Sequence, residues 1–326
     1  WSSDVCSSDL LIYTTWGQQN IGVGTAPLFT NTAGSNNVAV GHAPMYYNTV
    51  GSNNTAIGHV TLYNNTVGGN NTALGYIALQ FQTTASYNVA LGSYAMNVNT
   101  TGAQNTAVGF NAMTQNTYGI SNSAFGYGAL YNNTTGGYNT AVGFNALNAN
   151  TTGVGNIAFG YNALVNSTYT LYNTALGYLA LQADTTGDGN TAVGWSVMQF
   201  NTTGYNNTAV GAQALQSNTS GYGNVAVGHK VLTTTTTANY NTGLGYQAFL
   251  NSTTGDRSVA IGAFALRDNT TGNYNTAVGY SALLVNTYGI YGTAIGVQAL
   301  ASNTTGNYNT TVGFNSQIRS EEHTSE

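Results

Sequence analysis

A glycine recurs at every seventeenth residue of this chain, without a single insertion or deletion. The eighteen copies are Gly24, Gly41, Gly58, Gly75, Gly92, Gly109, Gly126, Gly143, Gly160, Gly177, Gly194, Gly211, Gly228, Gly245, Gly262, Gly279, Gly296 and Gly313. Loops of a globular domain accept extra residues, so a globular fold gives no reason for such strict spacing. In a solenoid each coil lies over the previous one, and like residues must stack. The period therefore predicts a solenoid, and we number each coil from its glycine as position 0.

The two ends of the chain do not share this repeat. One DNA sequence can encode Ser3–Leu10 on one strand and Arg319–Glu326 on the other, as a sequencing adapter read at both ends of a short contig would. We therefore interpret residues 1–10 and 319–326 as adapter-derived, non-native tails. Residues 11–318 are then expected to form one β-solenoid repeat domain, which is a fragment whose true termini are missing.

The remaining repeat is nearly uncharged. Its only ionised side chains are Asp184, Asp188, Asp256, Asp268, Lys230, Arg257 and Arg267. Without a basic patch we expect no nucleic-acid partner. Cys6, the only cysteine, lies in the excluded tail, so we expect neither disulfide nor thiolate chemistry. No apolar run is long enough to span a bilayer, so membrane attachment is expected only through a missing anchor domain.

Two columns of large apolar residues are predicted to form the core. Position −1 is large and apolar in all eighteen copies, for example Val40, Ile57 and Leu74. Position +4 is Leu, Met or Phe in seventeen copies and fails only at Gln317. Position −2 is almost always Ala, which indicates a narrow inner corner or a close contact with another chain. Stacking coils would bury a continuous apolar column that one coil cannot bury alone.

Polar residues recur with the same period. Position −4 is Asn in sixteen copies, and position +8 is Thr in all seventeen copies that have it. Stacked identical amides and hydroxyls can bond up the stack, as in cross-β ladders. Position +10 is usually Gly and predicts a corner. We therefore predict an all-β, parallel β-solenoid of about eighteen 17-residue coils, with two strands per coil, N-T-A-V and Y-N-A-L.

Single coils resemble a known repeat. The segment Arg257–Gly262, R-S-V-A-I-G, and less closely Asn53–Gly58, N-N-T-A-I-G, resembles the head repeat of YadA-type trimeric autotransporter adhesins. The fuller consensus N-T-A-V-G-Y-x-A-L-x-x-N-T-T-G-x-Y is also similar to shaft repeats of phage tail-fibre-like proteins. The resemblance covers residues 20–315 and implies a left-handed β-roll, a homotrimer, and display at the cell surface or on a virion. The 17-residue coil is longer than the family's usual coil, which leaves corner shape and trimer packing open.

No catalytic or metal-binding constellation is found, so we expect neither an enzyme nor a cofactor. His42, His59 and His229 share position +1, where an aromatic residue usually stands, and a packing column explains them. The four aspartates of the repeat are scattered, whereas calcium-binding β-roll repeats need one per coil. The glycines are repeat corners, because no Gly-Lys-Ser/Thr follows them.

Position +1 supplies the candidate ligand-binding residues, namely Tyr76, Tyr127, Tyr161, Tyr178, Trp195, Tyr246 and Tyr280. The simpler interpretation is a stacked aromatic ladder, in which each pair contributes about 0.5–1.5 kcal/mol beyond its buried area. The functional interpretation is an exposed, uncharged stripe that binds surface glycans or matrix-type proteins, because Tyr supplies contact area at low entropic cost. Further tyrosines recur at position −5, from Tyr87 to Tyr308.

The unbroken threonine row at +8 raises a different function, ice binding. Adjacent threonines on a strand point in opposite directions, however, so they do not pair on one face. We predict instead a structural and adhesive rod of an extracellular fibre, the head and stalk of a bacterial trimeric adhesin. The alternative is the shaft of a phage tail fibre. Flanking sequence would distinguish them, as a membrane β-barrel anchor or a virion-attachment region.

Overall fold

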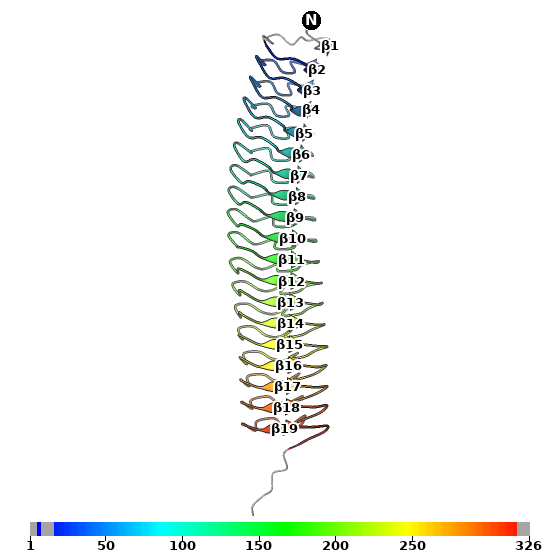
Figure 1. Cartoon of the computed structure of the whole chain (residues 1–326), viewed down its shortest axis with the longest axis vertical. Helices are drawn as coiled ribbons and strands as arrows, with labels where there is room; N and C mark the ends of the chain where they lie inside the picture. The colour runs from blue at the N-terminus through cyan, green and yellow to red at the C-terminus, as the bar shows by residue number, and fades with distance from the viewer. Residues whose placement is uncertain (1–4, 8–15, 318–326) are drawn as a thin grey trace, which may run out of the picture. The chain divides into compact units, whose positions relative to one another are not determined.

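The computed structural model describes residues 5–7 and 16–317 and divides into two units, Trp1–Tyr172 and Asn173–Glu326. Both units consist of short β-strands joined by turns, and no helix occurs among the described residues (Figure 1). The two tails interpreted as adapter-derived lie outside the described residues, apart from Val5–Ser7. That interpretation therefore stays a prediction.

In the first unit every strand pairs in parallel with the strand of the next coil. The strands are β1 (Val5–Ser7), β2 (Ile21–Thr25), β3 (Val38–His42), β4 (Thr55–His59), β5 (Thr72–Leu74), β6 (Val89–Leu91), β7 (Thr106–Val108), β8 (Ser123–Phe125), β9 (Thr140–Val142) and β10 (Ile157–Phe159). Strand β1 pairs with β2 through Val5 and Ile21, an offset of sixteen residues. Every later pair keeps an offset of seventeen, as Ala107 with Ala124.

The second unit repeats this arrangement with parallel pairs throughout. Its strands are β11 (Thr174–Leu176), β12 (Thr191–Val193), β13 (Thr208–Val210), β14 (Val225–Val227), β15 (Thr242–Leu244), β16 (Val259–Ile261), β17 (Thr276–Val278), β18 (Thr293–Ile295) and β19 (Thr310–Val312). Like residues therefore lie over like residues in both units. The predicted all-β, parallel solenoid with 17-residue coils is confirmed in each of them.

The prediction of two strands per coil is wrong, because only the N-T-A-V segment forms one. The Y-N-A-L segment is a series of turns with left-handed residues at +2 and +4, such as Ile77 and Leu79, both at φ 51°. A left-handed conformation costs a non-glycine residue about 1–2 kcal/mol. Bonding to neighbouring coils offsets this cost, since the Leu79 N–H donates to the Ala95 carbonyl at 3.1 Å. The turns swing the +4 side chain inward, where it is buried.

The prediction for the core is half right. Side chains at +4 are fully buried from Leu28 to Leu283, and Leu300 is nearly so. Position −1 is wrongly assigned to the core, since Ile57, Leu74 and Phe159 are 37%, 45% and 51% exposed. Alternation along a three-residue strand turns −2 inward and −1 outward. The narrow interior accepts alanine at −2 and +3, so the large −1 side chains lie outside.

Two ladders of buried asparagine run along the stacking direction. At −4, the Asn122 N–H donates to Asn105 Oδ1 at 2.9 Å and its Nδ2 donates to the Gly136 carbonyl at 2.8 Å, while its Oδ1 accepts from the Asn139 N–H at 2.9 Å. The sequence predicted this ladder. A second ladder at +7, unpredicted, links Asn116 Nδ2 to Asn99 Oδ1 at 2.7 Å. Buried amides are costly unless they are bonded, and these ladders satisfy them coil after coil.

The ladder at +7 is interrupted in places, and each interruption has a local consequence. Where Gln82 follows Asn65, and where Thr235 follows Asn218, the Oδ1 of the preceding asparagine has no hydrogen-bond partner. Threonine hydroxyls at +8 also bond up the stack, but to carbonyls and not to each other, as Thr117 Oγ1 does to Thr134 O at 3.0 Å. The buried polar groups of the interior therefore find hydrogen-bond partners because successive coils carry the same residue at the same position.

The repeating glycine admits no side chain, for two reasons. Its φ lies in the left-handed half of conformational space, at 133° for Gly262. In addition, a Cβ on Gly262 would lie 2.5 Å from the carbonyl oxygen of Gly279 in the next coil. Gly313 has a similar φ of 130°, but nothing lies within 4 Å of the position of its Cβ. A side chain at Gly262 would meet both backbone strain and a clash with the next coil, whereas one at Gly313 would meet the strain alone.

We expect Gly262→Ala to destabilise the second unit by about 3 kcal/mol or more, because strain and the steric clash add. Gly313→Ala should cost only the strain, on the order of 1 kcal/mol. Urea unfolding followed by circular dichroism measures both. Equal destabilisation by the two variants would show that close stacking at position 0 is unimportant.

Candidate functional site

The seven predicted ligand-binding residues at +1 all lie half exposed at the end of a strand. Their exposed fractions run from 45% for Tyr161 to 51% for Trp195. Each follows the repeating glycine, whose positive φ turns the chain away from the strand. Each of the seven rings is therefore presented outward from a different coil.

In the first unit these rings belong to an aromatic ladder that spans eight consecutive coils. Centroids of neighbouring rings lie 4.9–5.9 Å apart. The members, in order, are His42, His59, Tyr76, Tyr94, Phe110, Tyr127, Phe144 and Tyr161. The predicted stacking at +1 is confirmed for this unit, and so is the packing of His42 on His59.

Sequence reasoning missed how the ladder stays continuous. Where +1 is Ser93, the ring comes from Tyr94 at +2, which contacts Tyr76 at 5.6 Å and Phe110 at 5.9 Å between centroids. In the second unit Phe264 does the same between Tyr246 and Tyr280. The signal was visible as an aromatic residue at +2 wherever +1 is Ser93 or Ala263.

The structure joins only part of the predicted set in the second unit. His229, Tyr246, Phe264 and Tyr280 form one series there, with centroids 5.4–5.7 Å apart. Trp195 is separated from His229 by the coil with Ala212 at +1. Contacting ring pairs thus include five of the seven, namely Tyr76, Tyr127, Tyr161, Tyr246 and Tyr280, and the set does not converge on a single point.

A hollow lies beside Tyr127. Gly128 takes position +2, where the coils on either side have Asn111 and Asn145. The missing side chain leaves a pocket of about 280 Å³, which is also lined by Tyr131, Asn132 and Asn148. Asn148 Nδ2 donates to the Gly128 carbonyl at 2.9 Å and so fixes one wall. An aromatic ring beside several amides is a surface suited to an uncharged polar ligand.

Tyrosines at −5 form a second stack in the second unit. Tyr274, Tyr291 and Tyr308 stack with centroids 4.9 and 5.0 Å apart. Arg257 occupies −5 in the coil before them, and its guanidinium lies 5.6 Å from the ring of Tyr240 and 5.7 Å from the ring of Tyr274. Arg257 thus replaces a tyrosine through cation–π contacts on both sides, which sequence reasoning did not find.

The two units differ in their content of charged residues. The described residues of the first unit, 16–172, include no Asp, Glu, Lys or Arg. In the second unit Arg267 pairs with Asp268 at 2.6 Å, which lowers the pKa of that carboxyl. Within the described part of the chain, no group of three or more His, Cys, Asp or Glu could hold a metal ion. The described surface of the first unit therefore offers aromatic rings and neutral hydrogen-bonding groups without the charges of Asp, Glu, Lys or Arg.

Asp184 interrupts the +7 ladder of the second unit with a buried acid. Its Oδ1 accepts bonds from the Gly187 N–H at 3.1 Å and from Asn201 Nδ2 at 3.0 Å. Asn173 Nδ2 lies 3.3 Å from its Oδ2. Burial raises the pKa of Asp184 to about 8, although the bonds from Gly187 and Asn201 lower it and the charge of Asp188 raises it further. The side chain is therefore protonated at neutral pH and occupies the place of an amide.

No protein-family model matches the chain, and no curated protein matches its sequence significantly. Among the described residues, no helix has the length and apolar character needed to cross a membrane.

The pKa of Asp184 predicts that stability falls as pH rises. Because the native carboxyl keeps its proton up to about pH 8 while the unfolded one loses it near its usual pKa of 3.8, this contribution is complete below about pH 4 and is lost towards about pH 8. Asp184→Asn should remove this slope, because an amide in the same place does not titrate. Urea midpoints across that range measure it, with the exposed Asp188→Asn as control. A wild type with a flat profile, or an equal effect of the control, would contradict the assignment.

Proposed function

We propose that this chain is a structural and adhesive section of an extracellular fibre, the head and stalk of a trimeric adhesin. Its support is a stack of near-identical coils, together with exposed columns that are almost free of charge. The resemblance to YadA-type head repeats adds the trimer and the location at the cell surface. Association of three copies and adhesion to uncharged surface ligands are the two parts of the proposal.

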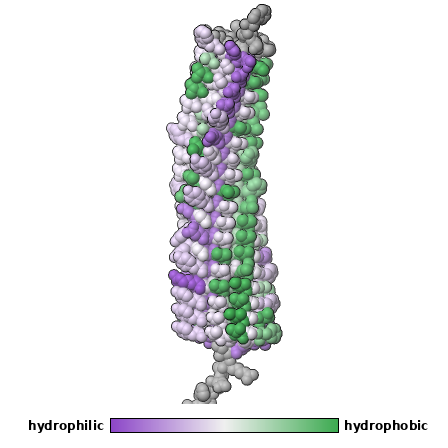
Figure 2. All heavy atoms as spheres, in the orientation of Figure 1, coloured by the Kyte–Doolittle hydropathy of each residue, from purple (hydrophilic) through white to green (hydrophobic). Residues whose placement is uncertain are grey.

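The observation that carries the proposal is the exposure of position −1. In the first unit Ile57, Leu74, Phe125 and Phe159 are 37–51% exposed, and in the second Leu176, Leu244 and Ile295 are 42–45% exposed. Among the described residues none of the −1 side chains is buried. Figure 2 shows hydrophobic side chains gathered in a column over each unit. Contiguous apolar patches on this scale mark interaction sites in soluble proteins.

A second copy of the chain suits this surface better than an unrelated partner. Every copy carries an apolar residue at −1 with the same spacing, so copies placed side by side in parallel can match at every coil. The first unit has no Asp, Glu, Lys or Arg among its described residues, so like charges of these residues do not oppose the contact there. Rotation about an axis along the stack closes such contacts into a ring, and three copies are what the resemblance implies.

The aromatic ladder supports the adhesive part. Its rings are held by their neighbours, yet those of Tyr76, Phe110, Tyr127, Phe144 and Tyr161 stay 43–50% exposed. Rigid aromatic surfaces give contact area at low entropic cost. Surface glycans and matrix-type proteins are the ligands that we propose for it.

We expect the full chain to sediment as a trimer. The double variant Leu74→Ser, Phe159→Ser should weaken this association by at least about tenfold, because each change removes exposed apolar area from the −1 column. Phe81→Ser combined with Tyr169→Ser is the matched control, since these rings are 44% and 61% exposed outside the −1 column. Sedimentation equilibrium measures all three proteins. A monomeric wild type would contradict the association, a dimer would contradict the trimer, and equal weakening by the control would contradict the role of −1.

A further inference from the structure

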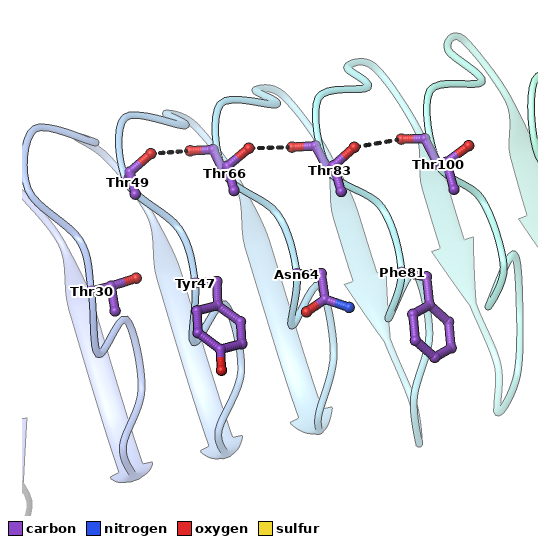
Figure 3. Close-up of a pocket in the computed structure, with 8 residues that line it drawn as sticks. All are labelled: Thr30, Tyr47, Thr49, Asn64, Thr66, Phe81, Thr83 and Thr100. Carbon is purple, nitrogen blue, oxygen red and sulfur yellow. Dashed lines mark hydrogen bonds between the residues drawn. The ribbon is translucent and has the colours of Figure 1, made fainter.

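A groove lies on the first unit, and none of its lining residues belongs to the aromatic ladder. Its volume is about 550 Å³, and its wall carries one side chain per coil at position +6: Thr30, Tyr47, Asn64 and Phe81. The threonines at +8 form the opposite row, from Thr49 to Thr100. Figure 3 shows the two rows side by side, with Asn64 between the rings of Tyr47 and Phe81.

Two aromatic rings form platforms in this groove. Tyr47 and Phe81 are 45% and 44% exposed. They lie two coils apart, which is roughly 10 Å at the usual spacing of paired strands. Edge contacts with Tyr46 at 4.9 Å and Tyr63 at 5.1 Å between centroids hold the ring of Tyr47 in place. The platform therefore exists before any ligand arrives.

The polar groups of the groove are neutral and of two kinds. The side-chain amide of Asn64 has no hydrogen bond to the described part of the protein, so it offers donors and an acceptor between the two rings. The threonine hydroxyls have already donated, as Thr49 Oγ1 does to Thr66 O at 2.9 Å and Thr66 Oγ1 does to Thr83 O at 3.0 Å. Their oxygens therefore face a ligand as acceptors only.

The groove does not suit a peptide strand or a charged ligand. Backbone N–H groups along its wall bond to the next coil, as Tyr47 does to Tyr63 O and Phe81 to Asn97 O, both at 3.0 Å. No unpaired strand edge is therefore offered for β-augmentation. The residues lining the groove are Thr, Tyr, Asn and Phe, so a charged ligand would lose its hydration without gaining a counter-charge.

We propose that this groove binds an uncharged, extended β-linked hexose polysaccharide lying along the stacking direction. Such a chain advances by roughly one sugar per coil spacing. Alternate sugars then place their apolar ring faces on Tyr47 and Phe81, and the sugar between them bonds through its hydroxyls to the Asn64 amide. Sugar hydroxyls also donate to the acceptor row of threonines. The inference takes one premise from the proposed adhesive function, namely that the chain is displayed where it would meet a polysaccharide.

The test is calorimetric titration of the full chain with cellohexaose, at low and at high sodium chloride. We expect saturable binding that salt leaves unchanged, because no charge takes part. Phe81→Ala and Asn64→Ala should each weaken binding by at least about tenfold, because the first loses a platform and the second the central amide. Phe200→Ala is the matched control, since Phe200 also occupies +6, is 50% exposed, and has no aromatic residue two coils away at +6.

Absence of binding at millimolar cellohexaose, a loss of affinity at high salt, or equal weakening by Phe200→Ala would overturn the proposal. Circular dichroism verifies that each variant is folded, which is expected because the altered side chains are partly exposed. Sedimentation of the same samples separates the two proposals. A trimer that does not bind rejects the groove alone, whereas a monomer that binds supports the groove and rejects the association.

Discussion

Axial hydrogen bonds between buried asparagines are the interaction on which each unit depends. Within the stack, amides at −4 accept a bond from the next coil and donate one to a corner carbonyl, as Asn122 does with Asn139 and Gly136. A displaced coil would leave both groups buried and unbonded, at a cost of about 1–3 kcal/mol for each group. The same stacking brings successive glycines together so closely that a Cβ is excluded. These two constraints explain why the period never varies.

A narrow interior has a consequence for the surface. Alanine at −2 and +3 and amides at −4 and +7 leave room for one large side chain per coil, at +4. The remaining hydrophobic and aromatic residues must then lie outside, in columns with the same spacing. Exposed apolar and aromatic columns are therefore a product of the fold. They support both the proposed association and the proposed adhesive surface.

The places where sequence reasoning failed share one cause. Val40 and Leu74 are as apolar and as regular as Leu79, so pattern alone could not tell the exposed column from the buried one. The left-handed residues Ile77 and Leu79 turn a segment that alternates like a strand into turns. The sequence shows a recurring Asn at +7, directly before the threonines. That these amides are buried follows only from the path of the backbone through each coil. The groove could not be predicted, because Tyr47 and Phe81 stand two coils apart in a column of mixed residues. Only the structure shows that both side chains line one wall.

The sequence alone determined the period, the parallel stacking of like residues, the amide ladder at −4 and the stacking of rings at +1. Each of these follows from repetition, because any side chain must meet its own equivalent when coils overlie one another. Only the tertiary structure decided which face of each short strand points inward, and that decision rests on the backbone angles of the turns. Those angles put Leu at +4 inside and the −1 residues outside. They thereby decide which side chains a partner or ligand would meet.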